Sequence, residues 1–407
     1  MDLRIVFWLS SFALSTFSAV SLAGSSSGTY SVDDYSAKGD GKSDDTKAFN
    51  DAWAAACADS GSPTLMIPGN KYVVGPLLFK GPCQNTGPLT VKVQGTVLAS
   101  TNLNLFTGQE WVLFYKVNQL RLTGTGTFDG QGTTAWPQNQ CPFKKQCKVL
   151  PVSLKFAFLK DTVVSGITSL NPKMFHIALL NNEGIKFQNV HIKAPGDSPN
   201  TDGIHIETST GVQILQSDIG TGDDCISIGH GNTDVYVEGV NCGPGHGISV
   251  GSLGRYSYEK DVTGVIVKGC TISGTMNGVR IKSWQASPSS ISATNMTFDN
   301  IILKDVGNPI IIDQNYCPFK SACAQQAPSR VKISGITFSN IRGTSTTPVG
   351  VTMQCSKAYP CQNIKVQEIN LSYNGPGGPI TSSCANVKAS YSGKQSHLTN
   401  YWVAMYL

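Results

Sequence analysis

Short hydrophobic runs recur at a fixed step in the middle of this chain, and the repeat limits what the chain can fold into. Runs of the same form begin at Gly203, Cys225 and Gly247, two successive steps of 22 residues (203 to 225 and 225 to 247). A fourth run begins at Gly278, 31 residues after the third, beyond an insertion at about 251–260. A step in the low twenties, with several short strands in each step, is typical of a solenoid. A β-sandwich would not need matching sequence at fixed steps. We therefore predict an all-β fold, a single-domain right-handed parallel β-helix.

Other segments fit the same coil. A second set of runs alternates with the first, at 184–187, 211–214, 233–237 and 264–267. One helix is predicted, at about 45–57, because the N-terminal acids Asp44 and Asp45 precede a stripe formed by Phe49, Trp53 and Ala56. Such a helix would cover the first turn of the coil, which would otherwise expose a bare sheet edge.

The N-terminus resembles a secretory signal. Arg4 precedes an apolar run, and small residues stand at Ser21 and Ala23, where a signal peptidase cleaves. A membrane anchor is disfavoured because the run is short and interrupted by serines. We therefore expect residues 1–23 to be removed and residues 24–407 to form a secreted domain that acts in the extracellular space or cell wall.

Twelve cysteines suit an oxidising compartment. Zinc binding is disfavoured because no two cysteines have the C-x2-C spacing, so no metal is expected. Cys270 and Cys384 are left without an obvious partner. Proximity in the sequence favours the disulfides Cys225–Cys242, Cys355–Cys361, Cys317–Cys323 and Cys141–Cys147, with Cys57–Cys83 as a further pair. Asn295 and Asn370 begin N-glycosylation sequons.

The net charge of +5 suits a polyanionic partner, although many proteins without such a partner have a similar charge. The sequence has no run of lysine and arginine of the kind that indicates nucleic-acid binding. No nucleic-acid partner and no membrane partner are therefore expected.

The repeat also aligns polar residues. The positions just before the four runs are Asp202, Asp224, His246 and Asn277, which would form one column on successive turns. Arg280 and Lys282 alternate with the apolar Val279 and Ile281 and should therefore point outward. With Asp223, this patch would gather three carboxylates, one imidazole and two cations. Aspartate is common at turns, but adjacent like charges cost stability, which favours a functional role.

Four motifs occur in order: Asn200-Thr201-Asp202, Gly222-Asp223-Asp224, Gly245-His246-Gly247 and Arg280-Ile281-Lys282. Together they closely resemble the signatures of the polygalacturonases, glycoside hydrolase family 28. Segments 37–49 and 126–132, with Trp136 and Tyr316, are also similar to this family, and the resemblance covers most of the mature chain. Segments 194–205 and 242–256 most resemble its plant exo-acting branch, including pollen members.

The resemblance implies hydrolysis of α-1,4-linked galacturonan with inversion and without a cofactor. Asp223 would be the general acid, and Asp202 and Asp224 would hold and activate the water. Such an enzyme needs an acid on one face of the glycosidic bond and a base on the other. His246 would tune Asp223. The substrate, a pectic polysaccharide, would be bound by Arg280, Lys282, Tyr316, Asn200 and His205, and the protein is expected to be a monomer.

Three alternatives remain open. Endo action competes with exo action, which would need a cleft closed at one end, with the loops at 141–144 and 317–320 as candidate walls. A pectin or pectate lyase would need calcium-binding acids or an arginine base instead of this acid column. A non-catalytic pectin-binding β-helix would use the acids only as turn residues.

The segment Gly222-Asp223-Asp224-Cys225-Ile226-Ser227-Ile228-Gly229 poses a question of parity. Alternation along a strand would turn Asp224 to the same side as Ile226 and Ile228, that is, into the core. An unpaired carboxylate there would be costly. We therefore predict that the strand begins at Cys225 and that both acids lie at a turn and point outward.

Overall fold

The computed structural model describes residues 27–139, 147–318 and 327–395. The predicted signal at 1–23, the cysteines Cys141 and Cys323, and most of the two candidate cleft walls lie outside the described residues. Among the described residues, no helix has the length and apolar character needed to cross a membrane.

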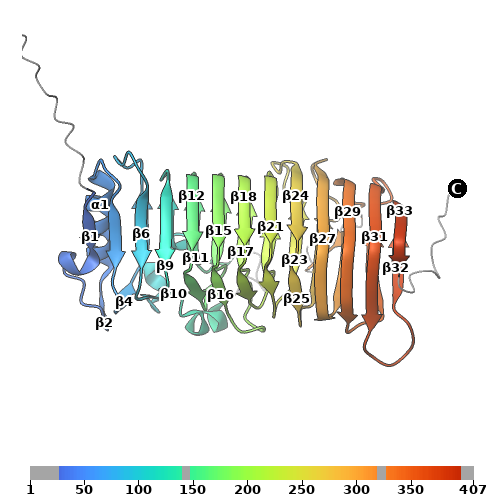
Figure 1. Ribbon diagram of the computed structural model, residues 1–407, viewed down its shortest axis with the longest axis horizontal. Helices are drawn as coiled ribbons and strands as arrows, with labels where there is room; N and C mark the ends of the chain where they lie inside the picture. The colour runs from blue at the N-terminus through green and yellow to red at the C-terminus, as the bar shows by residue number, and fades with distance from the viewer. Residues whose placement is uncertain (1–26, 140–146, 319–326, 396–407) are drawn as a thin grey trace, which may run out of the picture.

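The chain forms a right-handed parallel β-helix, as predicted, drawn out along one axis from the N-terminal to the C-terminal end (Figure 1). Strand pairing is parallel between successive turns, and typical turns contribute three short strands, so that two sheets of 11 and 22 strands enclose the core. The 11-stranded sheet contains β5 (Leu77–Lys80), β8 (Glu110–Tyr115), β11 (Val152–Ala157), β14 (Ile177–Leu180), β17 (Ile204–Glu207), β20 (Ile226–Ile228), β23 (Ile248–Leu253), β26 (Asn277–Trp284), β28 (Asn308–Tyr316), β30 (Val349–Gln354) and β32 (Thr381–Ala385).

The larger sheet covers the rest of the coil and becomes continuous where the late strands lengthen. It contains β1 (Thr29–Ser31), β2 (Asp40–Asp44), β3 (Thr64–Ile67), β4 (Lys71–Val74), β6 (Leu89–Val93), β7 (Thr96–Ala99), β9 (Leu120–Gly124), β10 (Thr127–Asp129), β12 (Lys160–Ser165), β13 (Thr168–Leu170), β15 (Glu183–Gln188), β16 (His191–Lys193), β18 (Thr210–Leu215), β19 (Asp218–Gly220), β21 (Thr233–Glu238), β22 (Asn241–Cys242), β24 (Val262–Lys268), β25 (Thr271–Ser273), β27 (Ser292–Val306), β29 (Lys332–Ser345), β31 (Cys361–Tyr373) and β33 (Val387–Gln395).

The register follows the repeat in the sequence. Ile204 pairs with Ile226, Ile226 with Ile248, and Ile248 with Val279. All four side chains are fully buried and stack in the core. Ile248, Ser249 and Val250 keep the register across the 31-residue step, and the register shifts where the insertion begins, between Val250 and Leu253.

The helix α1 (Thr46–Ala58) lies at the N-terminal end of the coil (Figure 1). Its apolar stripe packs inward, with the Trp53 ring stacked on Phe79 at 4.6 Å and the Phe49 ring edge-on to Tyr72 at 5.4 Å. The helix therefore covers apolar side chains that the first turns would otherwise expose. Four short 3-10 helices complete the described elements: η1 (Val32–Tyr35), η2 (Leu103–Leu105), η3 (Gly132–Thr134) and η4 (Trp136–Gln138).

Disulfides join Cys57 to Cys83, Cys225 to Cys242 and Cys355 to Cys361, which are pairs that sequence proximity had favoured. Cys270 and Cys384 are free thiols. Asn295 and Asn370 are both exposed, so each sequon is accessible to glycosylation, which remains a prediction.

Candidate active site

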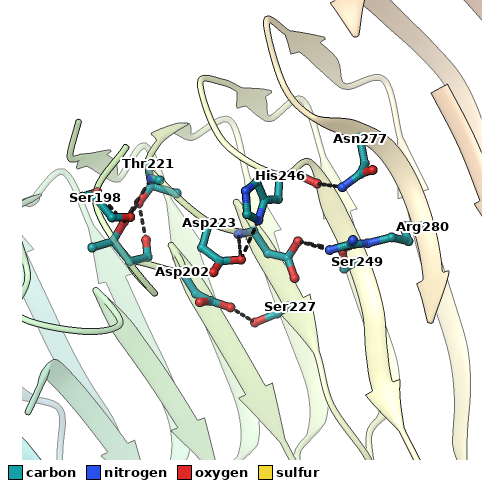
Figure 2. Close-up of polar contacts among 12 residues, drawn as sticks. Ser198, Asp202, Thr221, Asp223, Ser227, His246, Ser249, Asn277 and Arg280 are labelled. Atoms are coloured by element: carbon teal, nitrogen blue, oxygen red, sulfur yellow. Dashed lines mark hydrogen bonds and ion pairs between the residues drawn. The ribbon is translucent and has the colours of Figure 1, made fainter. Parts of the chain in front are cut away.

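A row of polar residues crosses the 11-stranded sheet where the chain enters β17, β20, β23 and β26 (Figure 2). Backbone hydrogen bonds fix the row, with the Gly203 amide donating to the Asp224 carbonyl at 2.9 Å and the Cys225 amide to the Gly247 carbonyl at 2.8 Å. At the next step the Asn277 amide group donates to the His246 carbonyl at 3.2 Å. Asp202, Asp224, His246 and Asn277 therefore occupy equivalent positions on successive turns.

The turn before β20 answers the question of parity. Cys225 and Ile226 are both fully buried in the core, so the chain bends at this point and alternation does not extend back to Asp224. The regular strand begins at Ile226, one residue later than predicted, because Cys225 belongs to the bend. Gly222 is required in this turn because a Cβ there would lie 2.0 Å from the Ser198 carbonyl oxygen.

Hydroxyl groups hold the turn in place. The Gly222 amide donates to Thr201 Oγ1 at 3.0 Å, and Thr201 Oγ1 lies 2.7 Å from Ser198 Oγ. Thr221 Oγ1 also bonds to Thr201, which ties the acid pair to the turn that carries Asp202 (Figure 2).

Asp224 is on the outside of the coil, yet its side chain is only 1% exposed. Lys282 Nζ lies 2.8 Å from its Oδ2, and Arg280 Nη2 lies 3.0 Å from its Oδ1, so two cations cover it. Ser249 Oγ donates to Oδ1 at 2.8 Å. Burial alone would raise the pKa of Asp224, but Lys282 and Arg280, with the hydrogen bonds, outweigh it and lower that pKa.

Asp202 has the opposite environment. It is 7% exposed, and the hydrogen bond it accepts is from Ser227 Oγ, at 2.8 Å to Oδ2. Burial, followed by the negative charges of Asp223 and Asp224, raises the pKa of Asp202 well above its ordinary value. The pKa values of these two carboxylates on neighbouring turns are thus shifted in opposite directions.

Asp223 is the most accessible of the three acids, with 22% of its side chain exposed. His246 Nδ1 lies 2.9 Å from Oδ1, and the Asp224 backbone amide donates to the same oxygen at 2.8 Å. Among the described residues no hydrogen bond to Asp223 Oδ2 is found, so this oxygen can meet a ligand. His246 thus lies in hydrogen-bond contact with Asp223, and its role in tuning that acid stays a prediction.

The two cations also lie beside Tyr316 at the end of β28. The ammonium of Lys282 is 5.2 Å and the guanidinium of Arg280 is 6.0 Å from the centre of the Tyr316 ring. Tyr316 packs edge-on against Trp284 at 5.7 Å. An aromatic face beside two cations suits a sugar that carries a carboxylate.

Asn200 and His205 were also predicted to contact the substrate, and their surroundings differ. Asn200 is exposed at the turn before Thr201, with a left-handed backbone (φ 53°) that asparagine tolerates. His205 has both ring nitrogens engaged, with Nδ1 2.7 Å from Ser227 Oγ and Nε2 3.2 Å from Glu207 Oε1. A role for His205 as a substrate ligand would require breaking these contacts.

Sequence reasoning missed the serines that hold the carboxylates, Ser227 and Ser249. Serine inside a strand carries little information by itself. The repeat alignment did hold a signal, because Ser227 and Ser249 stand in one column with His205 and Arg280.

Ligand atoms of Asp223, Asp224 and His246 lie within 4.8 Å of one another, so these residues could approach a cation. Each is already engaged, however, because Asp224 pairs with Lys282 and Arg280 and His246 Nδ1 contacts Asp223. This donor set does not fit a resident metal without dismantling those contacts.

Comparisons with known proteins identify the family of this chain. The profile of the glycosyl hydrolases of family 28 matches residues 57–395. An exopolygalacturonase from Platanus acerifolia is 52% identical over 371 residues, covering 91% of this chain and 97% of that protein. An exopolygalacturonase from Zea mays is 45% identical over 367 residues, covering 90% of this chain and 89% of that protein.

Solved structures share the fold at low sequence identity. An endo-xylogalacturonan hydrolase from Aspergillus tubingensis superposes with a TM-score of 0.75 at 22% identity, covering 89% of this chain and 98% of that chain. A polygalacturonase from Erwinia carotovora superposes with a TM-score of 0.68 at 22% identity, covering 90% of this chain and 97% of that chain. With the family profile and the close relatives, these findings show that the chain is a glycoside hydrolase and belongs to family 28.

Proposed function

We propose that this protein is a secreted polygalacturonase that hydrolyses α-1,4-linked galacturonan during pectin degradation in the cell wall. The proposal rests on one observation above all. Three carboxylates on adjacent turns have different environments, beside two cations and an aromatic ring that suit an acidic sugar. The relatives named exopolygalacturonase, at 45–52% identity, support the same substrate class.

In the proposed reaction, Asp223 donates its proton to the glycosidic oxygen through the accessible Oδ2. The bond between that oxygen and C1 breaks while a water attacks C1 from the opposite face, which inverts the configuration. The proton of the water passes to a carboxylate. Asp202 is the better acceptor because its pKa is raised by burial and by the neighbouring acids, whereas the lowered pKa of Asp224 makes that group a weak base.

Arg280 and Lys282 would have two tasks. In the free protein they hold Asp224 in its ionised form. With substrate bound, their remaining donors would contact the galacturonate carboxylate, since arginine has five N–H donors and lysine three. Tyr316 would support the sugar from the side.

Exo action is favoured by the relatives, and the products test it. From polygalacturonate we expect galacturonate monomer as the only small product from the first minutes of the reaction, measured by anion-exchange chromatography. A ladder of intermediate oligomers at early times would indicate an endo enzyme instead. Unsaturated products with ultraviolet absorbance would indicate a lyase, and complete absence of products would favour a non-catalytic pectin-binding protein.

Activity should require an acidic medium. Asp202 must be ionised to accept a proton, and its raised pKa places the acidic limb of the profile above the ordinary aspartate value of about 3.9. The leaving oxygen needs a proton from the general acid, so activity should fall again as the pH rises. A profile of kcat/KM against pH should thus be bell-shaped, with midpoints that belong to the coupled carboxylates together. Activity that keeps rising through neutral pH would contradict this mechanism.

A further inference from the structure

Asp202, Ser227, His205 and Glu207 form one continuous hydrogen-bond chain on the outer face of the 11-stranded sheet. Ser227 Oγ lies 2.8 Å from Asp202 Oδ2 and 2.7 Å from His205 Nδ1. The other ring nitrogen, His205 Nε2, lies 3.2 Å from Glu207 Oε1. Figure 2 shows one end of this hydrogen-bond chain, the bond between Ser227 and Asp202.

The chain is held in shape by its surroundings. Ser227 is 2% exposed, and the His205 side chain is 21% exposed. The ring of Phe175 packs on the imidazole with 4.9 Å between the ring centres. The buried Ser227 hydroxyl cannot turn to water, and the packed imidazole has a partner within this hydrogen-bond chain at each ring nitrogen.

Counting protons shows what this geometry requires. The Ser227 hydroxyl has one proton, which it can give either to Asp202 or to His205 Nδ1. If it donates to an ionised Asp202, then Nδ1 must carry a proton and donate to Ser227, while Nε2 must also be protonated to face the Glu207 carboxylate. If it donates to Nδ1, then Asp202 must be protonated and donate to Ser227, and the neutral ring keeps its proton on Nε2. The two arrangements contain the same number of protons.

We propose that Asp202 and His205 share one proton through Ser227. Glu207 holds this proton on His205. Asp202 therefore stays ionised and can receive the proton of the attacking water. The exchange moves one proton from Nδ1 to the serine oxygen and one from that oxygen to Asp202, so no atom is gained or lost. Ser227, His205 and Glu207 are then positioning residues. This inference rests on the proposed hydrolysis and gives Asp202 a means of acting as its base.

The device has a physical purpose. Burial and two neighbouring acids raise the pKa of Asp202 and so favour its protonated form, which cannot act as a base. The hydrogen bond from His205 lowers the pKa of Glu207, so this carboxylate is well suited to hold an imidazolium. Other elements also bring charged and titratable groups to this hydrogen-bond chain. Lys155, His230 and Tyr258 lie around Glu207, and Asp223, Asp224 and Lys282 lie around Asp202.

The first test is Glu207→Gln. Without the carboxylate, the proton should return to Asp202, and the acidic limb of kcat/KM should move up by about one pH unit, a loss of about tenfold at pH values below that limb. The matched control is Glu183→Gln, which removes an exposed carboxylate paired with Lys160 and should leave the profile unchanged. An acidic limb at the same pH in wild type and Glu207→Gln would overturn the proposal.

His205→Asn is the second variant, for the case in which Glu207→Gln does not fold. The asparagine amide can still donate to Ser227 but cannot carry the extra proton, so the same upward movement of the acidic limb is expected. A fall in kcat with an unchanged profile would mean that His205 has only a structural role, and would overturn the shared proton.

A measurement without substrate separates this inference from the proposed function. Nitrogen-15 NMR can follow the titration of the 6 histidines, and the His205→Asn variant identifies the His205 signal. We expect the Asp202→Asn variant to shift the titration of the His205 ring by about one pH unit. An unchanged titration would overturn the shared proton, whatever the activity. If the titration shifts but wild-type protein releases no sugar from polygalacturonate, then the shared proton stands and the proposed function fails.

Discussion

Replacing Asp223 by asparagine should lower the rate of galacturonate release from polygalacturonate by about 10²- to 10⁴-fold, the usual contribution of a general acid. The substitution keeps the size of the side chain and leaves an oxygen that can still contact His246 Nδ1, now 2.9 Å from Asp223 Oδ1. Folding should therefore be unaffected, and only the proton for the leaving oxygen is lost. Initial rates of reducing-sugar release measure the effect.

Asp234→Asn is a matched control for this experiment. Asn232-Thr233-Asp234 repeats the first family motif in sequence, but Asp234 is exposed on β21, a strand of the other sheet. This variant should keep wild-type activity. Full activity in Asp223→Asn would remove Asp223 from the role of general acid.

Replacing Lys282 by methionine should destabilise the fold by about 3 kcal/mol, at the lower end of the range for breaking a buried ion pair. The Asp224 side chain is 1% exposed and would lose its closest cation, at 2.8 Å, while keeping Arg280 and Ser249. Urea unfolding of the two proteins at neutral pH measures the difference. Lys268→Met breaks an exposed pair with Glu238, 3.4 Å apart, and should leave the stability nearly unchanged.

The environment of Asp224 decides how the stability of the fold changes with pH. The two cations lower the pKa of Asp224 in the folded protein. The stability that this shift contributes is therefore present above the pKa of aspartate in the unfolded chain. It is lost as the pH falls toward the lower pKa of the folded protein. The difference between wild type and Lys282→Met should therefore shrink in acid. The double variant Asp224→Asn/Lys282→Met should be more stable than Lys282→Met alone, and failure of this rescue would mean that lost packing, and not an unpaired carboxylate, explains the destabilisation.

The repeat made much of the fold predictable. Equal steps between Gly203, Cys225 and Gly247 determine which residues pair, because each turn of a solenoid contacts only its neighbours. The same alignment correctly placed Asp202, Asp224 and His246 in one row. Sequence spacing was enough to predict this row because the backbone register alone decides which residues stand in it.

The partners within the site could not be predicted in the same way. Which carboxylate receives Arg280 and Lys282 depends on how far two long side chains reach back across the turns, and their pairing with Asp224 is visible only in three dimensions. The burial of Asp224 follows from that pairing. The role of Ser227 was equally hidden, because a strand serine becomes informative only when its neighbours across the sheet are known.

The configuration of the first product shows whether these carboxylates hydrolyse the glycosidic bond with inversion. Proton NMR of polygalacturonate during the first minutes, before mutarotation, should show β-galacturonate released from the α-linked polymer. We expect the β-anomer alone at early times, and its loss in Asp223→Asn. Initial release of the α-anomer would mean that a covalent intermediate forms, and would contradict the assignment of Asp202 as a base that acts through water.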